Sequence, residues 1–157
     1  GVKVCNNLIS QHAKILTEGF NIINLTGDAR LNQLDKHIYR VDYITELYQP
    51  LMDFADVVVT RGGSNTLFEL IAMKKLHLVV PLGRQASRGD QIENALYAEK
   101  KGYSRQISEE QFTVDTLLSE VEALLENKDF YIQNMEQSTE IQSVDSFYRL
   151  LMEDIGR

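Results

Sequence analysis

The chain has 157 residues, a formal net charge of −7 and one cysteine, Cys5. This length suits one domain with a proper hydrophobic core. The acidic balance argues against a nucleic-acid partner, which would require a basic face. A single cysteine cannot form an internal disulfide, which is consistent with a reducing cytoplasm. We see no apolar run of membrane-spanning length and no signal-peptide pattern, so we do not expect the chain to cross a membrane.

Helices and strands are predicted to alternate over the first third of the chain. Apolar residues in the opening segment recur at helical spacing, and Gly19 follows as a helix end. Pro50 falls in the first turn of a later short helix, where proline is tolerated. The expected elements are a helix over 2–17, a strand over 20–25, a helical turn over 29–34, a strand over 37–41 and a helix over 48–54.

Residues 55–95 contain the most informative pattern of the sequence. A β-branched run over 56–60 has the composition of a strand buried on both faces. It ends at Gly62 and Gly63, after which apolar residues return at helical spacing. The start of a helix carries unpaired backbone N–H groups and the positive end of the macrodipole, and two glycines allow an anion to approach the backbone closely. The turn therefore has the features of an anion site.

A second strand-to-helix unit follows directly. We predict a strand over 77–81, a loop rich in Arg, Ser and Gly, and a helix that begins at Asp90. Residues 87–90 have the form of a capping box. Two helix starts are thus expected at the same edge of a parallel sheet, where ligands of open α/β folds bind.

Plainer interpretations stay open at this point. A Gly-Gly pair before a helix is common turn chemistry. Thr66 and Glu69 also fit a capping box, in which the glutamate would have only a structural role. The residues by themselves leave a nucleotide or sugar-phosphate site and an ordinary turn as alternatives.

The last third of the chain is predicted to be mostly helical. A helix over 91–101 ends at Gly102, and a short strand over 103–107 follows. Helical patterns with polar outer faces then cover 112–127, 129–135 and 144–155. We expect these helices to cover the sheet.

The 55–95 segment resembles the donor-binding half of the MurG-type glycosyltransferases. These enzymes transfer N-acetylglucosamine from UDP-N-acetylglucosamine to the lipid-linked muramyl-pentapeptide of bacterial cell-wall synthesis. Several motifs occur in order, which is more specific than any one of them, and the likeness extends more thinly from Gly1 to about Tyr103. The matching positions are 55–59, 60–63, Thr66, Glu69, Pro81, 87–91 and 94–95.

The resemblance implies an α/β fold, with a Rossmann-like parallel sheet and helices on both faces, as in the C-terminal half of a GT-B glycosyltransferase. Residues 1–157 would form one UDP-sugar-binding domain, without the N-terminal acceptor domain. The family's domain opens with a strand and a GGSxG loop. Gly1 and Asn6 match the last glycine of that loop and an asparagine in the helix after it. We therefore expect the first strand to be missing from this sequence.

The resemblance also implies a role for individual residues. The backbone near Ile44 would hold the uracil, although a core position is the simpler interpretation of this residue. Arg61 precedes the diphosphate site, and both a donor contact and a structural role stay open for it. Asp90 is a weaker match than its neighbour, because the family usually has glutamine there and an ionised Asp can only accept. The implied donor-binding residues are Gly63, Ser64, Asn65 and Thr66 for the diphosphate, Glu69 for the ribose, and Asp90 and Gln91 for the sugar.

The implied reaction is an inverting displacement at the anomeric carbon, with UDP as the leaving group. The catalytic base and the lipid-binding surface belong to the family's N-terminal domain, so we expect no catalytic residue here. We also expect no cofactor and no metal. The three histidines lack partners at metal-ligand spacing, and the segment Asp53-Phe54-Ala55-Asp56 is not an Asp-x-Asp motif. Arg84 and Arg88 are expected to be solvated loop residues.

The expected partners are UDP-N-acetylglucosamine and, through the absent domain, a lipid-linked acceptor at the cytoplasmic face of the membrane. Two other functions stay open. One is a stand-alone catalytic subunit of a two-chain UDP-sugar transferase. The other is a nucleotide-binding α/β module without transfer chemistry.

Overall fold

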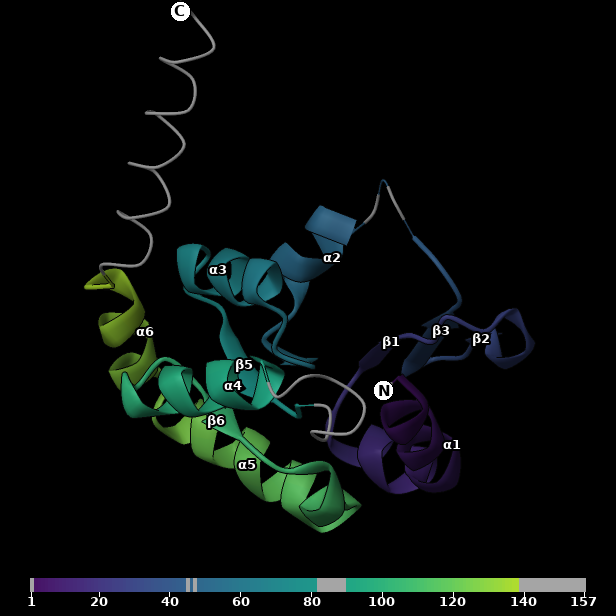
Figure 1. Ribbon diagram of the computed structural model, residues 1–157. Helices are drawn as coiled ribbons and strands as arrows, with labels where there is room; N and C mark the ends of the chain where they lie inside the picture. Colours follow the sequence, from purple (N-terminus) through teal and green to yellow (C-terminus); the bar gives the residue numbers. More distant parts are fainter. Residues whose placement is uncertain (1, 45, 47, 82–89, 139–157) are drawn as a thin grey trace, which may run out of the picture.

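The computed structural model describes residues 2–44, 46, 48–81 and 90–138. Helices and strands alternate through most of this chain, and the last described part is helical (Figure 1). The elements are α1 (Val2–Gly19), β1 (Ile22–Leu25), the 3-10 helix η1 (Ala29–Leu31), β2 (Gln33–Leu34), β3 (Ile38–Val41), α2 (Tyr48–Phe54), β4 (Val57–Thr60), α3 (Ser64–Ala72), β5 (Leu76–Val79), α4 (Asp90–Lys100), β6 (Arg105–Gln106), the 3-10 helix η2 (Glu109–Gln111), α5 (Val114–Glu126) and α6 (Lys128–Glu136).

The described strands form two three-stranded sheets, in the orders β1-β3-β2 and β4-β5-β6. All pairs are parallel except β2 with β3. The predicted α/β fold with a parallel sheet is confirmed. The described strands are divided between two sheets and are not joined in one, and β1 and β4 are edge strands of the sheets they belong to. The predicted helical turn over 29–34 is partly wrong, because η1 covers 29–31 and residues 33–34 form β2.

The strand predicted to be buried on both faces is less buried than expected. Val59 of β4 is 39% exposed, and β1 exposes Ile23 and Leu25 to the same degree, 38% and 39%. Both strands lack a neighbour on one side among the described residues. The fully buried strand is β5, all of whose residues are buried. An apolar run in this sequence therefore predicts a strand correctly, but it does not show whether that strand is central or at the edge of the sheet.

Helices cover both faces of the sheet that contains β5. Successive residues of a strand point to opposite faces. Leu76 and Leu78 belong to a cluster with residues of α1, α5 and α6, which also includes one residue each of α3 and α4. Val79 packs instead with Leu67 of α3 and Ala95 of α4. This arrangement confirms the prediction that helices lie on both faces.

A buried polar network attaches α1 to the other sheet. Asn6 of α1 donates to the carbonyl of Thr26, 2.9 Å away. The Arg40 guanidinium of β3 donates to Asn24 Oδ1 at 3.0 Å, to Ser10 Oγ at 2.9 Å and to the Asn6 carbonyl at 3.1 Å. Arg40 is buried, and within the described residues it forms no ion pair with a carboxylate. The hydrogen bonds of the buried Arg40 guanidinium thus go to neutral acceptors.

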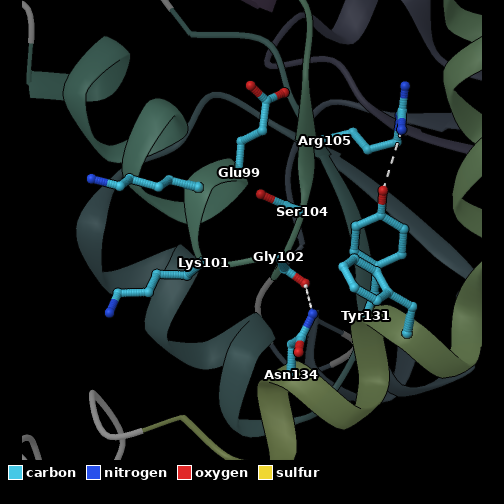
Figure 2. A pocket seen from close by; sticks show the side chains of 9 residues that line it. Glu99, Lys101, Gly102, Ser104, Arg105, Tyr131 and Asn134 are labelled. Atoms are coloured by element: carbon cyan, nitrogen blue, oxygen red, sulfur yellow. Dashed lines mark hydrogen bonds between the residues drawn. The ribbon is translucent and has the colours of Figure 1, made fainter.

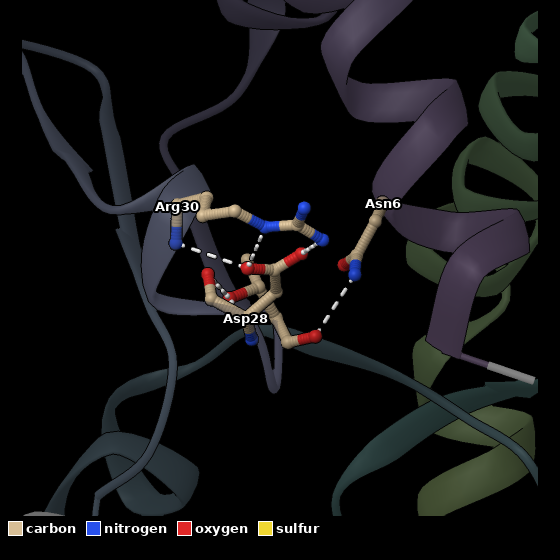
Figure 3. A network of polar contacts seen from close by, with 4 residues as sticks. Asn6, Asp28 and Arg30 are labelled. Atoms are coloured by element: carbon tan, nitrogen blue, oxygen red, sulfur yellow. Dashed lines mark hydrogen bonds and ion pairs between the residues drawn. The ribbon is translucent and has the colours of Figure 1, made fainter.

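The network continues to the surface beyond the end of β1. Asp28 accepts from the backbone and the side chain of Arg30, so that an exposed ion pair closes the 3-10 turn of η1. Figure 3 shows this pair beside Asn6. The Arg30 hydrogen bonds lower the pKa of Asp28 to about 2.

The remaining helix predictions agree with the structure where it describes them. The helix over 48–54 and the helix ended by Gly102 are confirmed, and the glycine has a φ of +77°. The helix predicted over 144–155 lies outside the described residues. Within the described part of the chain, no helix combines the length and apolar character needed to cross a membrane.

Candidate functional site

The turn between β4 and α3 brings two helix starts together. Gly62 has a φ of +93°, and a Cβ at this residue would lie 2.7 Å from Val79 Cγ1 and 3.4 Å from the Gln91 carbonyl oxygen. Only glycine tolerates both the backbone conformation and the close approach. The turn therefore packs against the end of β5 and the first turn of α4. Both helices accordingly begin at the carboxyl edge of this sheet, as the sequence predicted.

The start of α3 has backbone donors that lack an acceptor among the described residues. Its N-cap residue is Gly63, in extended conformation and without a side-chain cap. The first backbone hydrogen bond runs from Leu67 N to Gly63 O, at 3.0 Å. Within the described residues, the N–H groups of Ser64, Asn65 and Thr66 have no acceptor. These donors point out of the positive end of the helix, an arrangement that binds anions.

The alternative role for Glu69, as part of a capping box with Thr66, is wrong. Thr66 is the third residue of α3 and not its N-cap, because the helix begins at Ser64. Glu69 is an exposed residue of the same helix. Burial, and then the negative charge of Glu69, raise the pKa of Tyr48. Tyr48, at the start of α2, therefore lies near this carboxylate and belongs to the same region, which the sequence did not indicate.

Asn94 of α4 contributes to the site through the turn. Its Nδ2 lies 3.0 Å from the Gly62 carbonyl and 3.2 Å from Ser64 Oγ. One side chain thus joins the second turn of α4 to the start of α3. The sequence motif contained Asn94, but we assigned it no role. The available signal was its position four residues after Asp90, which places both on one helix face.

Arg61 has protein partners that suit a structural role. Its Nη1 donates to the Val80 carbonyl at 2.9 Å and lies 3.8 Å from a Glu109 carboxylate oxygen. Its side chain is largely covered, at 18% exposed. The guanidinium thus connects the end of β4 with the end of β5 and with η2. A contact between Arg61 and a donor substrate stays a prediction.

The other predicted residues lie around the same edge or outside the described chain. Ile44 is half-buried in the connection between β3 and α2. Asp90, exposed, and Gln91, half-buried, are the first two residues of α4. The capping box over 87–90 cannot be placed, because 82–89, with Arg84 and Arg88, lie outside the described residues.

A cavity of about 420 Å³ lies at the opposite edge of the sheet, where β6 begins (Figure 2). None of the predicted site residues lines it. Ser104, whose buried hydroxyl has no partner among the described residues, lies in its wall. The described residues contain no group of three His, Cys, Asp or Glu side chains placed to hold a metal ion. Because none of the predicted site residues lines it, the cavity is separate from the starts of α3 and α4.

Known proteins similar to this chain indicate its family. Residues 1–150 match the model of the glycosyltransferase family 28 C-terminal domain. A Streptococcus suis protein is 75% identical over all of this chain, a Streptococcus uberis protein is 61% identical over 99% of it, and a Streptococcus agalactiae protein is 57% identical over all of it. Each is named UDP-N-acetylglucosamine--N-acetylmuramyl-(pentapeptide) pyrophosphoryl-undecaprenol N-acetylglucosamine transferase.

The chain spans less than half the length of these relatives, 44%, 43% and 44% respectively. A crystal structure of the glycosyltransferase of kitacinnamycin is similar in fold, with a TM-score of 0.58 at 18% identity over 94% of this chain and 38% of that one. The match of the family model to nearly the whole chain decides the assignment: this chain belongs to the glycosyltransferase family 28 C-terminal domains.

Proposed function

We propose that the chain is the donor-binding domain of an inverting transferase that moves N-acetylglucosamine from UDP-N-acetylglucosamine to a lipid-linked muramyl-pentapeptide. The observation that carries this proposal is the uncapped start of α3, which Gly62 packs against the first turn of α4. A diphosphate requires several donors and a positive potential within a few ångströms. The N–H groups of 64–66, which have no acceptor among the described residues, and the helix dipole supply both.

The other parts of the donor are assigned to residues around this edge. Glu69 would accept hydrogen bonds from the ribose hydroxyls, for which an ionised acceptor suits a diol. Asp90 and Gln91, at the start of α4, would contact the sugar. The backbone at Ile44 would contact the uracil, and the half-buried side chain there offers an apolar wall for a flat base.

The chemistry of this half consists of binding the donor and stabilising the leaving group. Negative charge grows on the diphosphate as the anomeric bond breaks, and donors fixed in advance stabilise that charge without reorganisation. The acceptor hydroxyl must lose a proton to a base. We place that base, together with the surface that meets the lipid at the cytoplasmic face of the membrane, in an N-terminal acceptor domain of a longer parent protein. No metal or cofactor has a role in this scheme.

The names of the relatives support the choice of donor and acceptor, and the share of their length that the chain covers supports a division between two domains. A stand-alone subunit or a non-catalytic nucleotide module would also present a helix start to an anion. The preference among nucleotide ligands distinguishes the non-catalytic nucleotide module from the proposed function. The length of the parent protein distinguishes the stand-alone subunit.

Titration of the chain with nucleotides tests the proposal. Isothermal titration calorimetry should show binding of UDP and UDP-N-acetylglucosamine, and much weaker binding of ADP, whose base is a purine and not uracil. Equal affinity for UDP and ADP would support a general nucleotide module and contradict the proposal. A crystal soaked with UDP-N-acetylglucosamine should place the diphosphate at the start of α3. Density for the donor elsewhere would also contradict it.

A further inference from the structure

The hydrogen bonds of Asn94 determine how the Ser64 hydroxyl is oriented. The Gly62 carbonyl oxygen can only accept, so the Asn94 atom that faces it at 3.0 Å must be the amide nitrogen and not the amide oxygen. The same nitrogen lies 3.2 Å from Ser64 Oγ. An amide nitrogen carries two hydrogens and accepts none, so Ser64 Oγ is the acceptor of the second bond. The hydroxyl hydrogen of Ser64 is thus directed away from Asn94.

Ser64 lies at the helix start, where its hydroxyl hydrogen can be donated to a bound diphosphate. It is the first residue of α3, its side chain is exposed, and it neighbours the N–H groups at the helix start that have no acceptor in the described part of the chain. A serine hydroxyl that was free to rotate would be a donor or an acceptor toward a ligand. A serine whose oxygen accepts from Asn94 is set as a donor, which is the polarity that a diphosphate oxygen requires.

We propose that Asn94 is a positioning residue that sets the Ser64 hydroxyl as a donor to the diphosphate of a nucleotide sugar and fixes the turn that carries it. This assignment rests on the proposed function, because it needs a diphosphate at the start of α3. Asn94 does not touch the donor in this scheme. It acts through Ser64 and through the Gly62 carbonyl, and it couples the beginning of α4 to the diphosphate site.

The chain contains a matched control for the turn-fixing bond. Asn134 of α6 donates from Nδ2 to the carbonyl of Gly102 at 3.1 Å, and Gly102 also has a positive φ, +77°. This bond lies beside the cavity at the opposite edge of the sheet (Figure 2). Both bonds join a helical asparagine to a glycine 32 residues away. Leucine resembles asparagine in shape and has no hydrogen-bonding groups, so Asn94→Leu and Asn134→Leu remove equivalent bonds.

The experiment measures UDP affinity by calorimetry and the melting temperature for the unmodified chain, Asn94→Leu, Ser64→Ala, the double variant and Asn134→Leu. Ser64→Ala should weaken UDP binding about tenfold, the usual effect of one lost hydrogen bond to a charged group. Asn94→Leu should weaken it at least as much. The double variant should lose no more than Asn94→Leu alone, because in this scheme the Ser64 hydroxyl is no longer an oriented donor once Asn94 is replaced. Asn134→Leu should lower the melting temperature and leave UDP affinity unchanged.

Several results would overturn the assignment. One is a double variant whose losses add, because Asn94 would then act independently of Ser64. Another is a loss confined to UDP-N-acetylglucosamine with UDP unaffected, because Asn94 would then contact the sugar. If Asn94→Leu fails to fold, Ser64→Ala still decides, because an unchanged UDP affinity in that variant removes the donor role. Failure of the unmodified chain to bind UDP would instead refute the proposed function, and this assignment with it.

Discussion

Gly62 determines the geometry of the candidate site at the scale of single residues. Its φ of +93° and the 2.7 Å approach of Val79 Cγ1 leave no room for a side chain. Gly62→Ser should lower the free energy of unfolding by about 2–4 kcal/mol, from the left-handed backbone and the overpacking together. Urea denaturation measures this change.

The neighbouring glycine provides the control for this prediction. Gly63 is the N-cap of α3, has a negative φ, and a Cβ there would meet nothing within 4 Å. Serine is favoured at N-caps. Gly63→Ser should therefore keep or raise the stability, and equal losses at both positions would contradict the close-packing explanation.

The structure excludes one of the two roles that the sequence left open for Glu69. Glu69 is exposed on α3, and its capping role is excluded because the helix begins at Ser64. Glu69→Ala should reduce the free energy of UDP binding by about 1–3 kcal/mol, since the ribose hydroxyls lose their acceptor. Calorimetry with UDP measures the loss, and Glu122→Ala on the exposed face of α5 serves as the control. Unchanged affinity in a folded Glu69→Ala variant would mean that this carboxylate does not contact the ribose.

His77 makes the stability of the chain depend on pH. It is fully buried in β5, Nδ1 lies 2.8 Å from the Lys75 carbonyl, and Nε2 has no partner among the described residues. Burial lowers the pKa of His77 below its ordinary value. Below about pH 6.5 the unfolded chain therefore binds a proton that the folded chain does not.

The resulting stabilisation is complete above about pH 6.5 and is lost as the pH falls toward the folded pKa, by up to about 1.4 kcal/mol per pH unit. Urea denaturation between pH 7 and pH 5 should show a smaller decline in His77→Leu than in the unmodified chain. His37→Gln, at an exposed position, should keep the original decline. The same pH dependence in all three proteins would exclude His77 as its source.

At the scale of elements, Arg40 holds α1 against β1 and β3. Its three hydrogen bonds reach Asn24, Ser10 and the Asn6 carbonyl, and all lie in buried or half-buried surroundings. Arg40→Met keeps the apolar stem and leaves these acceptors unpaired, so the free energy of unfolding should fall by about 2–4 kcal/mol. Chemical denaturation measures it. Arg30→Met, which breaks an ion pair at the surface, should change the stability far less.

The accuracy of the predicted helices and strands depended on whether the sequence pattern of each was local. The helix over 48–54 was predicted with its correct bounds, and the helix before Gly102 within one residue, because periodicity and turn residues act within a few positions. β2 was missed, since two residues paired with β3 carry no pattern of their own. The burial of β4 was overestimated because its apolar composition suits an inner strand, whereas its exposure depends on neighbours distant in the chain.

At the scale of the whole molecule, binding and transfer should be separable. The chain covers 44% of the Streptococcus suis relative, and we assign the acceptor base to another domain. The chain alone should bind UDP weakly and transfer no N-acetylglucosamine. An assay with radiolabelled UDP-N-acetylglucosamine and a lipid-linked muramyl-pentapeptide measures transfer, with the full-length Streptococcus suis protein as the positive control. Transfer by the chain alone would refute the division between the two domains.

The sequence by itself determined the kinds of elements, the strand-to-helix turns and the resemblance to a donor-binding domain, because spacing, glycine positions and short motifs are local properties of a chain. Only the tertiary structure decided that Gly63 occupies the N-cap position of α3 without a side-chain cap, that Arg61 is held by Val80 and Glu109, and that Asn94 reaches the turn at Gly62. The last of these contacts joins residues 32 positions apart, and it exists because α4 packs against the β4–α3 turn. Side-chain partners at that separation follow from packing, which no local pattern specifies.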